Sequence, residues 1–414
     1  MLLYIDPGTG SMLFTILIGI LSAGIYAGRG LWMKLKFLIQ GGNVKVDDSD
    51  RVPFAIFTDS KRYYTIFKPI CDEMEKRGQT LLYLTGENDD PLLNENYEFV
   101  KTEFAGEGNR AFARMNLLKA DVVLSSTPGL NVYQWKRSRD VKHYAHVYHS
   151  ANDATRYRMF GIDFYDTLFL SGEYQIKQIR DLEKMRNIPE KEIVLAGLPH
   201  LDALQKRLQN AAPEIKQTKT VLLAPTWGPS GLFSRYGDKI INKLLETDYE
   251  VIIRPHPQSF TSDKELIDKL MAEFPDNDRL RWDQSIDNFD VLNRSDILIS
   301  DFSGVIFDYT LVFEKPVIYS QTAFDNGIYD AWWLGDDQMW TFKALDQIGR
   351  QLNDTNIDKI DEIIEDCLSD ETFKERIAQA KSETWVNEGK SVNTIVDYMI
   401  DKQKSLLSAE EKAS

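Results

Sequence analysis

Short apolar runs alternate with helix-like segments along most of the sequence, and this alternation is the feature that most restricts the fold. The strand-like runs occupy residues 54–59, 81–86, 121–127, 143–149, 167–172, 192–197, 220–225, 249–255, 296–301 and 315–320. Runs of this length, rich in Val, Ile and Leu and separated by helical patterns, are typical of parallel strands that are buried on both faces. The sequence therefore predicts an α/β fold with helices on both faces of parallel sheets.

A polar stretch near residues 205–218 separates two halves that share this pattern. We expect an N-terminal Rossmann-like lobe over residues 45–205 and a C-terminal Rossmann-like lobe over residues 215–385. A closing helix and tail follow over residues 386–414. Ligands of such sheets bind beyond the carboxyl ends of the strands, so we expect the two lobes to face each other across a ligand-binding cleft.

Residues 1–40 have the features of a membrane anchor and a basic juxtamembrane segment. No charged side chain occurs from Pro7 to Gly28, and a helix of that length measures about 33 Å, enough to cross the hydrocarbon core. Arg29, Lys34 and Lys36 follow directly, so the positive-inside rule places the rest of the chain in the cytoplasm. A signal peptide and a buried core helix are the alternatives. We expect a single-pass protein of the cell membrane.

Overall charge excludes one large class of partner. The chain has 49 Lys+Arg against 64 Asp+Glu, which gives a net charge of −15 at pH 7. An acidic surface repels phosphate backbones, so we expect no nucleic-acid partner. The two cysteines, Cys71 and Cys367, are too few for a disulfide framework and match no zinc spacing.

Two polar motifs follow strand candidates of the second half. Thr226 and Trp227 come after the run 220–225, where the hydroxyl can bind a ligand and the indole can pack on a base or ribose. In the motif RPHP, Arg254 offers a fixed positive charge for phosphate oxygens and His256 can neutralise a diphosphate or transfer a proton. An isolated surface histidine is the alternative for His256.

A third motif, SDFSGVIFDY, joins a strand candidate to a helix candidate. The strand is predicted to end at Ser300 and Asp301, and the helix to begin at about Phe302 with Ser303 and Gly304 in its first turn. Free N–H groups, hydroxyls and a glycine at a helix start make a phosphate site. Asp301 can instead cap the helix, or accept hydrogen bonds from a ribose or substrate hydroxyl.

Three histidines in the first half, His143, His146 and His149, are spaced three residues apart. Because their segment reads as extended, successive members point to opposite faces, and no carboxylate or cysteine completes a metal site. We therefore expect no metal. His149, at the strand's end and followed by Ser150, is expected to face the cleft as a general base for an acceptor hydroxyl. A structural histidine is the alternative.

Three segments, taken together and in order, resemble the CDP-glycerol glycerophosphotransferase family, the teichoic acid primases and polymerases with a GT-B fold. The segments are LLAPTW, IIRPHP and SDILISDFSGVIFDYTLVFEKPVIY. Residues 146–175 and the motif GLPHLD at residues 197–202 are similar to the acceptor lobe of that family. EGKSVNTIVDYM resembles its closing helix. The resemblance covers roughly residues 140–400.

The resemblance implies a GT-B-like fold and a reaction in teichoic-acid-like polymer synthesis. A phosphoalditol group would move from CDP-glycerol or a similar CDP-alditol to a hydroxyl of a lipid-linked acceptor at the membrane, with release of CMP and without a cofactor. His149 matches the family's proposed base, and His256 matches the histidine that contacts the diphosphate and leaving group. The residues that would line the CDP-alcohol pocket are Arg254, Thr226, Ser300, Asp301 and Ser303.

Three positions depart from the family pattern. Ser150 and Ala151 replace the Gly-Thr that usually follows the acceptor-lobe histidine, so the acceptor-side loop has changed. Gly228 stands where the family has a basic residue, and Gly304 replaces the second of two serines. A glycosyltransferase or sugar-nucleotide epimerase that uses a UDP-sugar, and an inactive membrane scaffold, are the alternative functions.

Overall fold

The structure is a computed structural model that describes residues 50–413, except residues 133, 213–215, 217, 286, 321–324, 326, 328, 331 and 334–338. Residues 51–414 form one compact unit by their contacts. The predicted anchor at residues 7–28 lies outside the described residues and stays a prediction. Within the described part of the chain, no helix is both long and apolar enough to cross a membrane.

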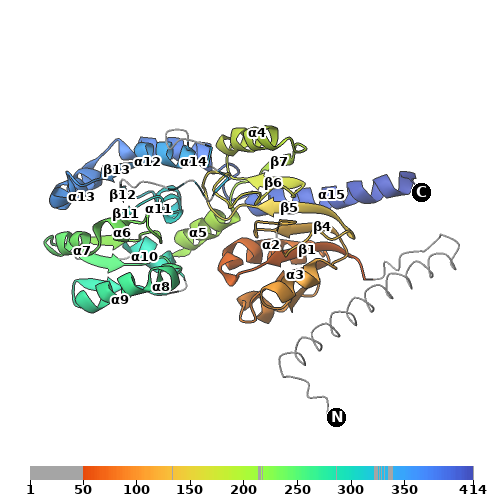
Figure 1. The fold of residues 1–414 in the computed structure, drawn as a ribbon, viewed down its shortest axis with the longest axis horizontal. Helices are drawn as coiled ribbons and strands as arrows, with labels where there is room; N and C mark the ends of the chain where they lie inside the picture. The colour runs from red at the N-terminus through yellow and green to blue at the C-terminus, as the bar shows by residue number, and fades with distance from the viewer. Residues whose placement is uncertain are drawn as a thin grey trace, which may run out of the picture. The chain divides into compact units, whose positions relative to one another are not determined.

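The N-terminal lobe is built on a 7-stranded parallel sheet with the order β3-β2-β1-β4-β5-β6-β7 (Figure 1). Its strands are β1 (Val52–Thr58), β2 (Leu81–Thr85), β3 (Val100–Phe104), β4 (Ala120–Ser125), β5 (Val141–Val147), β6 (Thr167–Leu170) and β7 (Glu192–Leu195). Its helices are η1 (Lys61–Tyr63), α2 (Tyr64–Lys76), η2 (Pro91–Asn94), α3 (Asn109–Met115), α4 (Tyr174–Arg186) and α5 (Pro199–Asn210). The central strands are buried along most of their length because both faces are covered.

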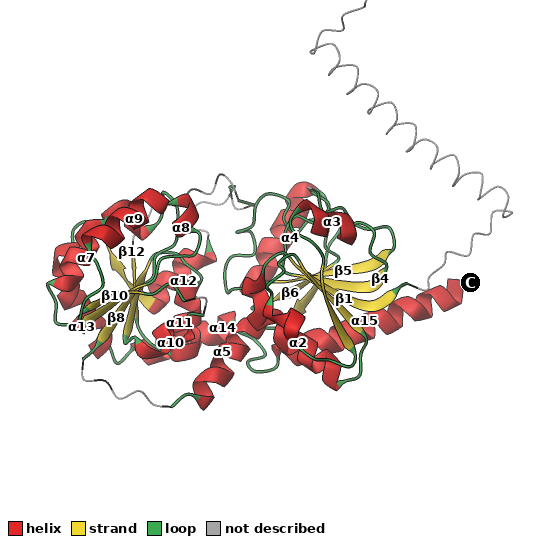
Figure 2. Ribbon diagram, turned by 90° about the horizontal axis from the view of Figure 1, so that it is seen from below, coloured by secondary structure: helices red, strands yellow, loops and turns green. Residues whose placement is uncertain are grey.

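The C-terminal lobe repeats this plan with a 6-stranded parallel sheet in the order β10-β9-β8-β11-β12-β13. Its strands are β8 (Thr220–Leu223), β9 (Glu250–Ile253), β10 (Leu280–Trp282), β11 (Ile297–Ser300), β12 (Val317–Ser320) and β13 (Gly349–Leu352). Its helices are α6 (Leu232–Tyr236), α7 (Asp238–Leu245), α8 (Ser259–Ser262), α9 (Lys264–Glu273), α10 (Phe289–Arg294), α11 (Val305–Phe313), α12 (Trp340–Ile348), η5 (Ile357–Lys359), α13 (Ile360–Ser369) and α14 (Phe373–Thr384). Figure 2 shows helices on both faces of each sheet, and the predicted pair of Rossmann-like lobes is confirmed.

The last helix, α15 (Ser391–Ala413), returns to the N-terminal lobe, where it lies against α2 and β4 (Figure 1). Its residues Ile395, Val396 and Met399 are buried in the same apolar cluster as Phe67 of α2. Asp202 of α5 fixes the start of this helix, because its carboxylate accepts hydrogen bonds from the backbone N–H groups of Gly389 (2.9 Å) and Ser391 (2.9 Å). The motif GLPHLD therefore helps to dock the closing helix.

The two lobes share one apolar core. Leu201 and Leu204 of α5 belong to the same buried cluster as Ile306 and Phe307 of α11, and α5 packs against α11. A polar link lies beside this core, because the Asp153 carboxylate accepts hydrogen bonds from the first backbone N–H groups of α12. These contacts fix the loop that follows β5 against the C-terminal lobe.

Candidate active site

The predicted site residues follow the carboxyl ends of neighbouring strands. In the C-terminal sheet, β8 lies between β9 and β11, so the loops that carry Thr226, His256 and Asp301 leave the sheet side by side. In the N-terminal sheet, His149 comes two residues after the end of β5. The sheet order therefore positions the three donor-lobe motifs together, as the sequence predicts.

Asp301 lies beneath the loop after β8 and does not face solvent. Its carboxylate is 0 % exposed and accepts hydrogen bonds from the backbone N–H groups of Thr226 (3.0 Å), Leu232 (3.0 Å) and Phe302 (2.8 Å). Burial raises the pKa of Asp301 to about 6, against the opposing effect of these donors. The Ser300 hydroxyl is equally buried and donates to the Ala224 carbonyl (2.6 Å). The prediction that these side chains line the ligand pocket is corrected: both hold the loops together from below.

The helix after β11 begins later than predicted. The Asp301 carboxylate accepts a hydrogen bond from the backbone N–H of Phe302, so the chain makes a turn there and α11 starts at Val305. Ser303 and Gly304 lie in this turn, where their carbonyls accept from Ile306 (3.1 Å) and Phe307 (3.0 Å). Both residues are half-buried.

Gly304 is the point where the acceptor-side loop approaches the donor lobe. A Cβ atom placed on Gly304 would lie 3.4 Å from the Ser150 Cβ and 3.4 Å from the Asn152 Nδ2. The Arg156 guanidinium crosses the same boundary and donates to the Phe302 carbonyl (3.1 Å). The fold thus brings the predicted acceptor-side residue Ser150 into contact with the SDFSG turn.

Arg254 is paired within its own lobe. Its guanidinium forms an ion pair with Asp283 and donates to the Ser285 carbonyl (2.8 Å). The carboxylate at the end of β10 therefore partly neutralises this charge, and the predicted role of Arg254 in binding phosphate oxygens stays a prediction. Thr226 is half-buried at the start of its loop, and Trp227 is 40 % exposed beside it.

His256 has one defined proton position. Its Nδ1 accepts a hydrogen bond from the backbone N–H of Gln258 (3.0 Å), so a neutral ring carries its proton on Nε2. Burial lowers the pKa of His256 to about 4, and the charges of Arg62 and Arg254 lower it further. At neutral pH His256 is therefore an uncharged hydrogen-bond donor through Nε2.

His149 is also uncharged at neutral pH. Burial lowers its pKa to about 4, with further contributions from the charges of His200 and Arg62. The ring lies 5.2 Å from the Tyr63 ring, measured between centroids, and its Nδ1 is 3.4 Å from the Tyr157 hydroxyl. Its Nε2 makes no hydrogen bond to a residue that the structure describes. A neutral imidazole with one free nitrogen can act as a general base.

Arg62 is a further candidate site residue, and no sequence motif marks it. It lies in η1, directly after β1, and its exposed guanidinium donates to the Ser60 hydroxyl (3.0 Å). Its charge is close enough to lower the pKa of both His149 and His256. None of the described carboxylates forms an ion pair with it. An arginine that has no ion pair with a described carboxylate, and whose charge acts on both neutral histidines, is suited to bind a phosphate.

His200, within the motif GLPHLD, is a second candidate site residue that was not predicted from the sequence. Its Nε2 is 3.1 Å from the Asp308 carboxylate of α11, and its Nδ1 is 2.9 Å from the Thr65 hydroxyl of α2. Burial lowers the pKa of His200, but the Asp308 carboxylate outweighs this effect and the net pKa is raised. His200 thus joins the two lobes next to His149.

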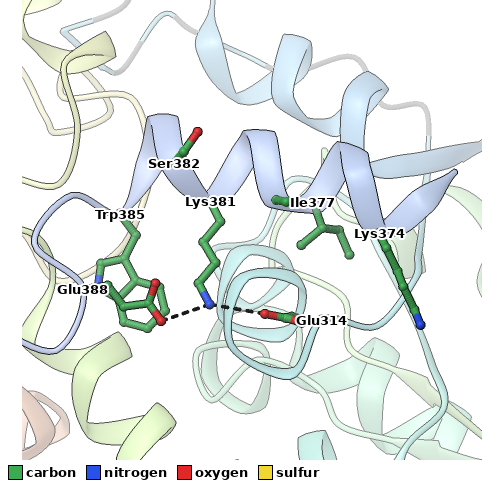
Figure 3. Close-up of a pocket in the computed structure, with 8 residues that line it drawn as sticks. Glu314, Lys374, Ile377, Lys381, Ser382, Trp385 and Glu388 are labelled. Atoms are coloured by element: carbon green, nitrogen blue, oxygen red, sulfur yellow. Dashed lines mark hydrogen bonds and ion pairs between the residues drawn. The ribbon is translucent and has the colours of Figure 1, made fainter.

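A separate cavity of about 250 Å³ lies beside α14 and contains none of the predicted site residues (Figure 3). Its lining residues are Glu314, Lys374, Ile377, Ala378, Lys381, Ser382, Trp385 and Glu388. The Lys381 ammonium pairs with Glu314 (3.2 Å) and Glu388 (3.0 Å). Elsewhere in the described residues, no cluster of three or more His, Cys, Asp or Glu side chains is arranged to hold a metal ion.

Comparison with known proteins relates this chain to one family and to individual teichoic acid enzymes. The model of the CDP-Glycerol:Poly(glycerophosphate) glycerophosphotransferase family matches residues 140–401. Teichoic acid ribitol-phosphate polymerase TarL of Staphylococcus aureus is 30% identical over 155 residues, which cover 33% of this chain and 26% of TarL. A teichoic acid ribitol-phosphate primase of Bacillus spizizenii is 24% identical over 253 residues, which cover 57% of this chain and 59% of the primase. The chain therefore matches less than two thirds of the length of either relative.

Solved structures share the fold. The wall teichoic acid polymerase TagF has a TM-score of 0.58 at 16% identity, with 92% of this chain and 99% of TagF covered. Staphylococcus aureus MnaA in complex with UDP has a TM-score of 0.59 at 14% identity, with 84% of this chain and 96% of MnaA covered. These likenesses support the GT-B-like arrangement of two Rossmann-like lobes.

Proposed function

The chain belongs to the CDP-glycerol:poly(glycerophosphate) glycerophosphotransferase family, and we propose that it transfers a phosphoalditol group from a CDP-alditol to an acceptor hydroxyl and releases CMP. The observation that carries the proposal is that His149 and His256, one from each lobe, follow the carboxyl ends of parallel strands, and that burial keeps both rings neutral at pH 7. An in-line transfer at phosphorus needs a base on the attacking side and charge neutralisation on the other side.

The chemical step follows from the two rings. The free Nε2 of His149 takes the proton of the acceptor hydroxyl, and the resulting oxygen attacks the phosphorus that bears the alditol. A new P–O bond forms to the acceptor, and the bond between this phosphorus and the bridging diphosphate oxygen breaks. The bridging oxygen leaves with CMP. The Nε2–H of His256 donates a hydrogen bond to the diphosphate oxygens, and the Arg62 guanidinium neutralises their charge.

The donor pocket is assigned to the C-terminal lobe. Among the predicted donor-binding residues, Thr226, Trp227 and Ser303 have partly exposed side chains, so they are proposed to contact the CDP-alditol. Asp301 and Ser300 act from beneath by holding the loop that carries Thr226. Ser150 is proposed to face the acceptor, because it lies beside Gly304 at the boundary of the lobes.

The acceptor is proposed to be lipid-linked and the protein to be a single-pass protein of the cell membrane, with this part of the chain on the cytoplasmic side. Support comes from the uncharged run from Pro7 to Gly28 and the basic residues that follow it. The related proteins act in teichoic acid synthesis by their names, and two of them use ribitol phosphate. Both CDP-glycerol and CDP-ribitol are therefore donors to test.

The test is CMP release by the detergent-solubilised full chain with a membrane lipid extract. We expect CMP from CDP-glycerol or CDP-ribitol, and loss of at least 100-fold in rate for His149→Ala and for His256→Ala. His143→Gln is the matched control, because His143 is a buried histidine of β5 that contacts Thr167 and Tyr398, away from this site. UDP release from UDP-N-acetylglucosamine without CMP release, or no release by a folded protein, would contradict the proposal.

A further inference from the structure

Three large apolar side chains lie exposed around one open cavity. Phe160 is 45 % exposed, Met185 is 47 % exposed and Trp332 is 55 % exposed. The cavity has a volume of about 570 Å³, and its remaining lining residues are Met159, Arg186 and Gly327. Clustered apolar exposure of this kind marks a contact surface, whereas single exposed apolar residues need no explanation. We call Met159, Phe160, Met185 and Trp332 the apolar face.

The fold holds Phe160 in a conformation that phenylalanine rarely adopts. Its φ is +66°, in the left-handed region that residues other than glycine avoid. Its backbone N–H donates to the Asp330 carboxylate (3.0 Å), and the Arg186 guanidinium lies 4.5 Å from the centre of its ring. Arg186 pairs with Asp163 and Asp330, and the Lys191 ammonium donates to the Asp163 carbonyl (2.6 Å). These contacts keep the exposed ring in place before any partner binds.

The apolar face lies at the amino edge of the N-terminal sheet. Met185 is the next-to-last residue of α4, which returns from the carboxyl end of β6 to the amino end of β7. Because β1, β4, β5 and β6 are parallel neighbours, β1 begins at the same edge. Three strand spacings separate β1 from β6, which is about 14 Å. The chain that leads to the proposed anchor therefore leaves the lobe at the edge that carries the apolar face.

Two exposed cations flank the apolar face. Arg158 directly precedes Met159, and Lys184 directly precedes Met185. Neither forms an ion pair with a carboxylate in the part of the chain that the structure describes. Since the whole chain has a net charge of −15, uncompensated cations beside an apolar surface are a local exception. Apolar side chains flanked by Lys and Arg are the pattern that binds the interface of an anionic bilayer.

We propose that the apolar face docks on an anionic phospholipid bilayer, with its side chains between the headgroups and the acyl chains and with Arg158 and Lys184 at the lipid phosphates. A second copy fits less well. A two-fold contact through this face would bring each cation close to the cations of the other copy, and like charges repel. The inference rests on the membrane anchor of the proposed function.

Docking at this face would also place the acceptor-side loop. Residues 148–166 connect the carboxyl end of β5 to the amino end of β6. This single segment carries His149 near its start and Phe160 near its end. A bilayer contact at Phe160 therefore holds the segment that bears the proposed base at a fixed height above a lipid-linked acceptor.

The test measures the bilayer depth of a spin label on the full chain in vesicles of phosphatidylglycerol and phosphatidylcholine. Met185→Cys carries the label, because the native thiols of Cys71 and Cys367 are buried. We expect the label at position 185 to lie about 5–10 Å below the lipid phosphates, where it collides more with O₂ than with a water-soluble nickel complex. Lys269→Cys, exposed on α9 of the C-terminal lobe, is the matched control and should stay in water.

Three outcomes would overturn the proposal. The label at position 185 could stay in water while the chain floats with the vesicles, in which case the anchor would stand without the docking. Burial of the label only after a lipid-linked acceptor is added would assign the cavity to the hydrocarbon chain of the acceptor. Dipolar coupling between labels without any lipid would assign the face to a second copy.

The charge of Lys184 is tested in the same vesicles. We expect Lys184→Glu to move the label at position 185 toward water, and added salt to have the same effect on the unaltered charge. Lys177→Glu is the matched control, because Lys177 lies in the first turn of the same helix and pairs with Asp181. Equal label depth in the two variants would contradict the role of Lys184. If the label were buried but no CMP were released, the proposed transfer would fail and the docking would stand.

Discussion

Asp153 offers the sharpest test of how the acceptor-side loop is held to the donor lobe. Its carboxylate is 2 % exposed and accepts hydrogen bonds from the backbone N–H groups of Trp340 (2.8 Å) and Thr341 (2.9 Å), which begin α12. The Thr341 hydroxyl and the Gln178 amide also donate to it. Asp153→Asn keeps the size of the side chain but replaces one acceptor oxygen by an NH₂ group.

The expected loss in the free energy of unfolding follows from the hydrogen-bond donors that lose their acceptor. An asparagine oxygen can keep one of the two backbone N–H groups, while the other faces NH₂ and stays unpaired in the core. One buried unpaired N–H costs about 1–3 kcal/mol, and the remaining bond loses about 1 kcal/mol because it is no longer charge-assisted. We therefore expect Asp153→Asn to lower the free energy of unfolding by about 2–4 kcal/mol.

The assay is urea unfolding of the full chain at pH 7, followed by CMP release well below the unfolding transition. Because the loop also carries His149, we expect kcat/KM to fall about tenfold. Asp90→Asn is the matched control: Asp90 is 0 % exposed and binds Leu92 N–H (3.0 Å) and the Tyr83 hydroxyl (2.8 Å) within the N-terminal lobe. It should lose stability with unchanged kcat/KM. A loss below about 0.5 kcal/mol for Asp153→Asn would show that these hydrogen bonds do not hold the loop.

Three further predictions concern single positions. Arg62→Ala should raise KM for the CDP-alditol about 10- to 100-fold, with partial recovery in Arg62→Lys because the charge is kept; steady-state kinetics of both variants check this. Burial holds the pKa of His146 at about 3, below the value of 6.5 in an unfolded chain, so its contribution to stability is complete above pH 6.5 and decreases as the pH falls toward 3. We expect the free energy of unfolding to fall between pH 7 and pH 5, and the fall to be about 2 kcal/mol smaller in His146→Gln than in the unaltered protein. Urea unfolding at the two pH values checks this. Gly304→Ala should change the free energy of unfolding by less than about 0.5 kcal/mol, because its Cβ would lie at an ordinary 3.4 Å from the Ser150 Cβ. Gly304→Val should lower kcat, because the larger side chain would displace the loop that carries Ser150. Thermal melting checks the first variant and steady-state kinetics the second.

The strands that carry the site were predictable from the sequence because they are buried on both faces. Ile297–Ser300 is buried throughout and reads as an apolar run. The strands Val100–Phe104, Leu280–Trp282 and Gly349–Leu352 were missed, since they lie at or beside the sheet edges and expose residues such as Lys101 and Arg281. Hydrophobic pattern identifies interior strands and fails where one face meets solvent.

The site residues were predictable only as far as their position at strand ends. The sequence places Asp301 after a strand, but its N–H donor at Leu232 lies 69 residues away in the chain, so its role beneath the loop depends on tertiary structure. Arg254 is similar, because its partner Asp283 belongs to another strand end. Arg62 belongs to no motif, and its charge affects the pKa of both histidines only because the fold places the end of β1, in the middle of the sheet, near them.

The most direct test of the central claim follows the phosphorus atom itself. CDP-glycerol and CDP-ribitol, each radiolabelled only in the phosphate next to the alditol, are given to the full chain with a lipid-linked acceptor. We expect the label to move to the lipid product while unlabelled CMP is released in equal amount, and we expect His149→Ala and His256→Ala to abolish both. Label in free phosphate or in a nucleotide product, or transfer that survives the loss of either histidine, would contradict it.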